Sequence, residues 1–150
     1  MELSEWASIA EIVGAIAVVG TLIYVGLEVR GNSVSLRASA SQAVSQSMTD
    51  ITAMLASDPA MAQLWRKGVA DFDSLTEKEE PQFSALMMCF ARRLENAYFQ
   101  NKLGILPAEQ WDAYAAVCDR ILQSGGGHTW WKNFGSQYVS SSFRKFVEDA

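Results

Sequence analysis

Histidine is almost absent from this sequence of 150 residues, because His128 is the only one. A single histidine excludes the paired Glu-x-x-His motifs of a ferritin-like di-iron bundle and the two-histidine motif of zinc proteases. It also leaves the many serines without a histidine base in any helical register. His128 follows a glycine run at a predicted helix end, so we expect a helix cap or a surface residue there.

Phosphate-binding glycine loops are missing as well. No Gly-rich segment follows a predicted strand and opens a helix, which both the P-loop and the dinucleotide-binding fingerprint require. The glycine run at residues 125–127 precedes aromatic residues and no phosphate-binding lysine. We therefore expect a protein that is not an enzyme, with no catalytic residue, no cofactor and no metal site.

Cysteine is scarce. Cys89 and Cys118 both lie inside helical patterns, and neither belongs to a CxxC motif. Such a pair neither requires an oxidising compartment nor suggests a structural zinc site. We expect both to be small buried residues, with burial blunting the reactivity of Cys89.

Basic residues do not occur before Arg30. All 12 Lys and Arg residues lie at or after it, whereas Glu2, Glu5, Glu11 and Glu28 precede it. The net charge of −5 thus belongs mostly to the first 28 residues. A chain without a clustered basic surface is not expected to bind nucleic acid.

An apolar run fills the region that lacks basic residues. Residues 7–27 read ASIAEIVGAIAVVGTLIYVGL, with one acidic residue as the only charge. As a helix they would extend about 31 Å, close to the hydrocarbon thickness of a bilayer. Trp6 and Tyr24 near its ends, and Arg30 just beyond, suit the membrane interface. We predict a transmembrane anchor over residues 1–30, with these three side chains as interfacial anchors.

The apolar run has two other interpretations. A cleaved signal peptide needs a basic start, and MELSEW has no Lys or Arg. A buried core helix is the stronger rival, because three glycines dilute the hydrophobicity, yet a domain of this size rarely surrounds a helix that is apolar on every face. Arg30 and Arg37 follow the run, so the positive-inside rule places the N-terminus outside and residues 31–150 in the cytoplasm.

Small residues line one face of the predicted span. Ala10, Gly14, Ala17 and Thr21 recur at i, i+4, i+7 and i+11. Small side chains let two helices approach closely in lipid, although alanine and glycine are also common in membrane helices generally. We predict that this face packs against another membrane-protein subunit or a second copy of the chain.

The remainder predicts an all-α fold, in which one N-terminal transmembrane helix is followed by a small bundle of five or six helices. Asp58-Pro59, the capping box of Thr76 and Glu79, and Gly104 supply start and stop signals. The helix that begins near residue 34 is either continuous with the membrane helix or separated from it by a bend, for which Gly31-Asn32 is the natural place. The expected helices cover residues 34–56, 59–67, 76–102, 107–124, a short turn around 130–131, and 142–148.

Two side-chain groups within the bundle have alternative interpretations. Arg92 and Glu95 are i, i+3 neighbours in an apolar stretch, and form either a half-buried ion pair that fixes helix packing or a pocket for an anionic ligand or partner. Adjacent tryptophans cannot both face one core, so we expect at least one of Trp130 and Trp131 to be exposed or engaged elsewhere. This pair either fills the core or forms a partner-docking surface.

Several stretches together resemble an uncharacterised family of small bacterial single-pass membrane proteins with a C-terminal helical domain. They are EIVGAIAVVGTLIYVGLEVRGN, the restart at Ser57-Asp58-Pro59, SLTEKEE, RRLENAYFQ, GGGHTWW and FRKFVEDA. The resemblance implies an anchor in the bacterial inner membrane and an all-α domain. It implies no activity and no site residue.

Three functions remain open at this point. The first is a non-catalytic membrane-anchored assembly protein, either an accessory subunit of a larger membrane complex or a self-assembling scaffold. The second is a homo-oligomeric cation pore, in which Glu11 and Glu28 would form acidic rings. The third is a soluble helical protein that binds a small apolar ligand, with residues 7–27 buried.

Overall fold

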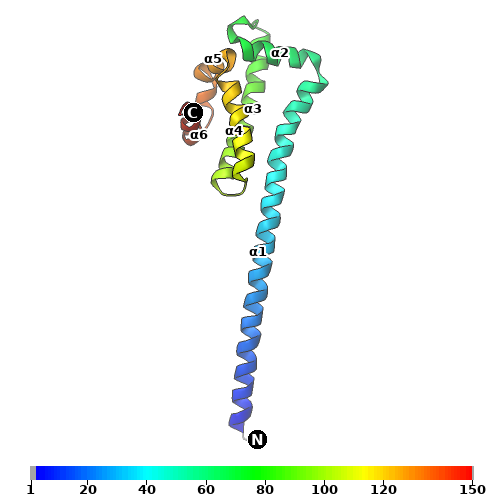
Figure 1. Cartoon of the computed structure of the whole chain (residues 1–150), viewed down its shortest axis with the longest axis vertical. Coiled ribbons are helices and arrows are strands. Elements are labelled where there is room, and N and C mark those ends of the chain that lie inside the picture. Colours follow the sequence, from blue (N-terminus) through cyan, green and yellow to red (C-terminus); the bar gives the residue numbers. More distant parts are fainter. Residues whose placement is uncertain (1–2, 150) are drawn as a thin grey trace. The chain divides into compact units, whose positions relative to one another are not determined.

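The computed structural model describes the backbone of residues 3–149 and the side chains of residues 11–149. All regular structure in this part of the chain is helical, which confirms the all-α prediction. The order is α1 (Leu3–Ser57), α2 (Pro59–Ala70), η1 (Phe72–Ser74), α3 (Glu79–Lys102), α4 (Ala108–Leu122), α5 (Gly125–Asn133), η2 (Gly135–Gln137) and α6 (Ser141–Glu148), where η marks a 3-10 helix (Figure 1). The chain divides into a first unit, Met1–Ser39, and a second unit, Ala40–Ala150.

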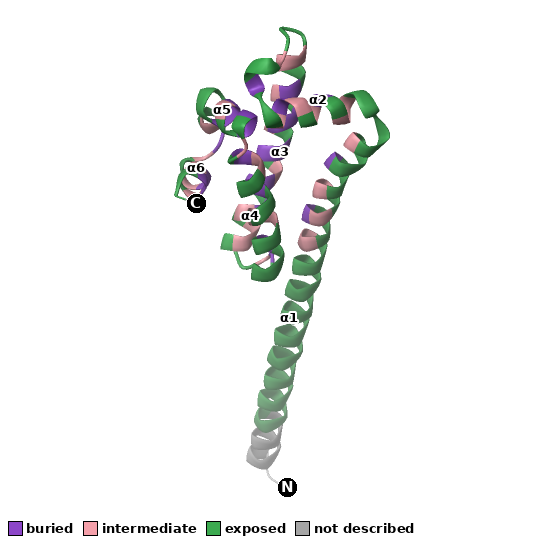
Figure 2. Ribbon diagram, turned by 45° about the horizontal axis from the view of Figure 1, so that its top comes forward, coloured by how far each residue is buried: buried purple, intermediate pink, exposed green. Residues whose placement is uncertain are grey.

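The first unit is the N-terminal part of α1. The helix continues through Gly31 and Asn32, where the sequence suggested a bend, because a lone glycine costs a helix only about 1 kcal/mol. Every described side chain from residue 11 to residue 39 is exposed (Figure 2). Among the described side chains the first buried one is Val44, so the second unit begins within α1.

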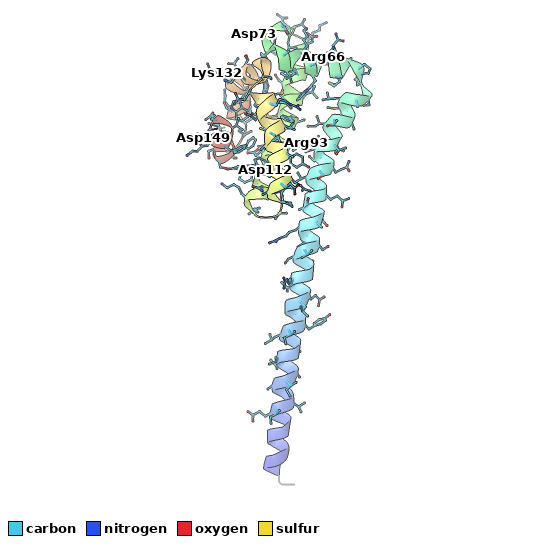
Figure 3. The ribbon with its side chains drawn as sticks, in the orientation of Figure 1. Arg66, Asp73, Arg93, Asp112, Lys132 and Asp149 are labelled. Carbon is cyan, nitrogen blue, oxygen red and sulfur yellow. The ribbon has the colours of Figure 1, made fainter. Side chains whose placement is uncertain are left out.

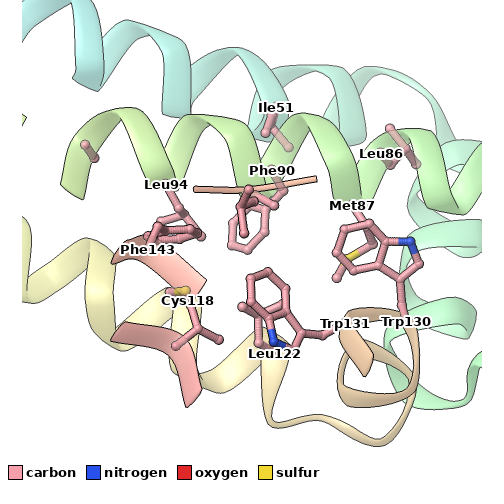
Figure 4. Packing of buried hydrophobic residues seen from close by; sticks show 14 of the residues in the cluster. Ile51, Leu86, Met87, Phe90, Leu94, Cys118, Leu122, Trp130, Trp131 and Phe143 are labelled. Atoms are coloured by element: carbon pink, nitrogen blue, oxygen red, sulfur yellow. The ribbon is translucent and has the colours of Figure 1, made fainter. Parts of the chain in front are cut away.

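The second unit has one hydrophobic core, to which the end of α1 and the helices α2 to α6 contribute. Figure 4 shows Ile51 from α1, Met87 and Phe90 from α3, Leu122 from α4, Trp130 from α5 and Phe143 from α6. Charged side chains such as Asp73, Lys132 and Asp149 lie at its periphery (Figure 3). The core is assembled from all parts of the unit, so no helix of it is expected to fold alone.

Local signals begin and end two of the helices as predicted. The Asp58 carboxylate accepts hydrogen bonds from the backbone N–H groups of Ala60 and Met61, at 2.9 and 3.2 Å, and Pro59 occupies the first position of α2. Gly104 follows the last turn of α3 with a φ of 67°, a conformation that favours glycine. Both signals act over a few residues and require no tertiary partner.

Glycine positions were the main errors in the predicted helix boundaries. The helix predicted to end before Gly68 continues to Ala70, because Gly68 is a packing position. A Cβ atom there would lie 2.3 Å from the Phe83 ring, so glycine lets α3 press against α2. The glycines at 125–127 were expected to stop a helix, but they form the first turn of α5, capped by the Ser124 hydroxyl.

The start of α3 is a capping box. The Glu79 carboxylate accepts hydrogen bonds from Lys67 Nζ at 2.6 Å and from the backbone N–H and the hydroxyl of Thr76, both at 2.9 Å. The Thr76 hydroxyl in turn accepts one from the Glu79 N–H at 3.3 Å. The helix begins at Glu79, three residues after the predicted start, because Thr76 precedes the helical turns that it caps.

Acid is expected to weaken this junction. The hydrogen bond from Lys67, followed by those from Thr76, lowers the Glu79 pKa from an ordinary 4.5 to about 2. A carboxyl with a lowered folded-state pKa stabilises the fold fully above about 4.5, and loses that contribution as pH falls toward 2. Glu79→Gln should therefore flatten the decline of the thermal unfolding midpoint between pH 5 and pH 2, with Glu77→Gln controlling for the change in net charge. A decline that Glu79→Gln leaves unchanged would contradict this assignment.

Candidate functional site

The first unit presents an apolar surface. By length and composition, α1 qualifies as a candidate membrane span within the described residues: an 18-residue window reaches a mean hydropathy of 2.2, and none of that window is buried. Because successive residues lie 100° apart around a helix, these side chains cover its whole circumference. Over residues 11–29 the large exposed hydrophobic side chains are Ile12, Val13, Ile16, Val18, Val19, Leu22, Ile23, Tyr24, Val25, Leu27 and Val29.

The small-residue face is open over its described part. Gly14, Ala17 and Thr21 are exposed, and no atom lies within 4 Å of a Cβ atom built on Gly14. The Thr21 hydroxyl donates to the Ala17 carbonyl at 2.8 Å, so its polar group is satisfied within the helix. The side chain of Ala10, the fourth predicted member, lies outside the described residues.

The predicted interfacial anchors are described in part. Tyr24 is 64% exposed and Arg30 is also exposed, so both side chains are accessible to the surroundings of the helix. The side chain of Trp6 lies outside the described residues. Tyr24 and Arg30 are six residues apart, which corresponds to about 9 Å along a helix axis.

Both tryptophans of the adjacent pair are buried in the same core, so the expectation that at least one is exposed or engaged elsewhere is wrong. Their burial agrees with the alternative interpretation, in which the pair fills the core. Trp130 is 0% exposed and Trp131 is 6% exposed. The Trp130 ring fills the space that a side chain at residue 135 would need, and Trp131 packs edge-on against Phe143 at 6.3 Å between ring centroids. Since α5 packs against α2, α4 and both 3-10 helices, adjacent side chains each find a separate part of the core. Neither indole offers a docking surface in the structure.

The Arg92–Glu95 pair acts within the fold. Glu95 is 7% exposed, and its carboxylate accepts hydrogen bonds from Arg92 Nη1 at 2.7 Å and from the backbone N–H of Ser140 at 2.6 Å. Arg92 Nη1 also donates to the Tyr138 carbonyl at 3.2 Å. Ser140 is the N-cap of α6, so the pair attaches the last helix to α3. Of the two interpretations of this pair, these contacts agree with the half-buried ion pair that fixes helix packing.

The two cysteines differ in their surroundings. Cys118 is buried in α4, and burial, with a smaller effect of Asp119, raises its thiol pKa to about 12. Cys89 is exposed on α3, so the expectation that it is buried is wrong. The run LMMCF around it supplies Met87 and Phe90 to the core, and Cys89 falls on the opposite side of the helix. A hydrophobic run therefore did not imply that each of its members is buried.

No group of three or more His, Cys, Asp or Glu side chains lies close enough to hold a metal ion, within the residues that the structure describes. His128 is exposed on α5, as the surface interpretation predicted. Its backbone N–H donates to the Ser124 carbonyl at 2.8 Å, as part of the first turn of the helix.

The second unit contains an apolar groove that the sequence did not reveal. It has a volume of about 470 Å³ and lies between the last turns of α1 and the helices α2, α3 and α4. Its lining residues are Ser45, Met48, Thr49, Ile51, Thr52, Leu55, Trp65, Phe90, Leu94, Tyr114, Val117 and Ile121. The helical period of Met48, Ile51 and Leu55 was visible in the sequence, but a period indicates which face is apolar and not which helices oppose it.

Two hydrogen bonds align the helices that flank the groove. Ser41 Oγ donates to Gln110 Oε1 at 2.7 Å, and the hydroxyls of Ser45 and Tyr114 are 3.1 Å apart. The second pair lies four residues, or about one turn, after the first on both helices. The end of α1 and the start of α4 therefore run parallel. The Ser45–Tyr114 pair thus marks one end of the groove, and Leu55 lies toward the other.

No protein-family model, no curated protein and no solved structure matches the chain.

Proposed function

We propose that this chain is a single-pass membrane protein, in which the first part of α1 anchors a non-catalytic helical domain that serves in assembly. The observation that carries the proposal is the exposed apolar circumference of α1 over residues 12–27, a stretch without a charged side chain. A helix that is apolar all round is stable only inside a protein or inside a bilayer. In water it would present an apolar surface larger than the patches that soluble monomers expose.

Hydrogen bonding in α1 also suits lipid. Backbone polar groups inside a bilayer must be satisfied within the segment, which a continuous helix achieves. A hydroxyl group inside a bilayer also needs a hydrogen-bond partner, and the Thr21 hydroxyl has one within the helix, the Ala17 carbonyl. The segment therefore brings few unsatisfied polar groups into the hydrocarbon region.

Charge gives the orientation that we propose. The chain has no Lys or Arg before Arg30, and Arg37 follows within two turns. Basic residues near the end of a span remain on the cytoplasmic side. In a bacterial inner membrane, the N-terminus is then outside and the second unit lies in the cytoplasm.

Assembly is the role that the open small-residue face supports. Gly14, Ala17 and Thr21, continued by Ala10 in the sequence, let another helix approach closely. The partner would be a subunit of a larger membrane complex or a second copy of the chain. In this proposal the membrane helix binds the partner subunit, and no catalytic centre is involved.

Native purification in mild detergent tests this assignment. The 16.5 kDa chain should elute in an assembly larger than its own detergent-bound monomer. Gly14→Leu should reduce that assembly, because a large side chain separates helices that pack through small residues. Gly26→Leu is the matched control on the far side of the helix, since a Cβ atom there also meets nothing within 4 Å. Wild-type protein that elutes as a monomer would contradict the assembly role.

A further inference from the structure

The apolar groove of the second unit is elongated. Its lining runs along α1 from Ser45 to Leu55, a rise of about 15 Å in a helix. Its volume is about 470 Å³. The volume lies within the ordinary range for small-molecule sites.

The form of the groove suits an extended small molecule. An unbranched chain can lie along the roughly 15 Å of α1 that the lining follows, and the volume is that of a small-molecule site.

The lining gives the polarity of the occupant. Not one of the twelve lining residues is charged, so a carboxylate or an ammonium group would lose its hydration without gaining a counter-ion. Most of the wall is apolar, and Phe90 and Leu94 are its most buried members together with Ile51. The partly buried hydroxyls of Ser45 and Tyr114 lie at one end, and each can still donate to or accept from a further polar atom.

We infer that this groove binds one neutral chain-like lipid molecule, with its apolar tail along α1 toward Leu55 and a hydroxyl or carbonyl end group at the Ser45–Tyr114 pair. Long-chain alcohols and neutral acyl esters belong to this class. The inference goes beyond the anchoring role and does not depend on it, because the groove lies wholly within the second unit.

Photocrosslinking of the full chain in lipid nanodiscs tests the inference. The probe is decanol carrying a photoreactive diazirine, and the labelled peptides are identified by mass spectrometry. Saturable labelling is expected in residues 45–55 and 114–121, with unlabelled decanol competing. Decyl sulfate should compete about tenfold less well, since no cation lines the groove.

Two variants at neighbouring exposed positions make the test specific. Thr52 lines the groove, so Thr52→Trp should fill it and reduce labelling of both segments about tenfold. Ala53 is exposed and does not line the groove, so Ala53→Trp should be labelled like the wild type. Circular dichroism melts establish that both variants are folded before they are compared.

The outcomes separate this inference from the membrane proposal. Labelling that is absent from both segments, or that Thr52→Trp leaves unchanged, would overturn the ligand site. Equal competition by decyl sulfate would overturn the neutral class of ligand. Labelling of the groove without any labelling of residues 11–29 would uphold the site and count against the bilayer span.

Discussion

Gly126→Ala is expected to destabilise the second unit by about 3 kcal/mol or more, at the upper end of what overpacking costs. A Cβ atom at this position would lie 1.8 Å from the Gly68 carbonyl oxygen and 2.8 Å from the Phe72 backbone nitrogen. Backbone atoms cannot rotate away as a flexible side chain can. Either α5 moves off α2, which opens the core around Trp130, or the unit fails to fold.

Denaturant unfolding followed by tryptophan fluorescence measures this effect, because Trp130 and Trp131 report on the core directly. Gly125→Ala provides a graded comparison, since its Cβ atom would meet only the Ala70 carbonyl, at 2.9 Å. It should fold and lose less stability than Gly126→Ala. Gly31→Ala meets nothing within 4 Å and should leave the fluorescence midpoint unchanged. A wild-type midpoint for Gly126→Ala would show that α2 and α5 are not in this contact.

Two arginines in the middle of the apolar segment should release the chain from membranes. Val19→Arg combined with Leu22→Arg places two charges on exposed positions near the centre of residues 11–29. Each central arginine costs about 3 kcal/mol on an insertion scale, so the pair costs roughly 6 kcal/mol. The wild type should stay in the pellet after carbonate extraction of membranes, and the variant should not.

The matched control puts the same charges further along the same helix. Val34 and Leu36 are exposed and lie after Arg30, beyond the proposed span. Val34→Arg with Leu36→Arg should therefore remain in the membrane pellet, and the added positive charge favours the proposed orientation. Release of the wild type from membranes by carbonate, or equal release of both variants, would contradict the proposed membrane anchor.

Features fixed by neighbouring residues were predictable from the sequence. The Asp58 cap, the capping box of Thr76 and Glu79 and the stop at Gly104 all depend on hydrogen bonds or dihedral angles within a few residues. The apolar segment was equally visible, because span length and hydropathy are sums over the sequence. These signals gave the all-α class and most helix boundaries.

Features fixed by a distant partner were not predictable. In the sequence both Gly68 and Gly126 resemble helix stops. Their packing roles depend on the Phe83 ring against Gly68 and on the Gly68 backbone against Gly126. The burial of both tryptophans depends on the several elements around α5. The groove was missed for the same reason, since it needs the register between Ser45 and Tyr114, far apart in the chain.

The contrast between the two thiols has a practical consequence. Cys89 is accessible, whereas Cys118 is buried and stays protonated at neutral pH because its pKa is about 12. A maleimide therefore modifies the wild-type chain at one place, on α3, and a single fluorophore or spin label can be attached without removing any cysteine. With a reagent that does not cross lipid, labelling of Cys89 in intact cells would test the proposed cytoplasmic placement of the second unit.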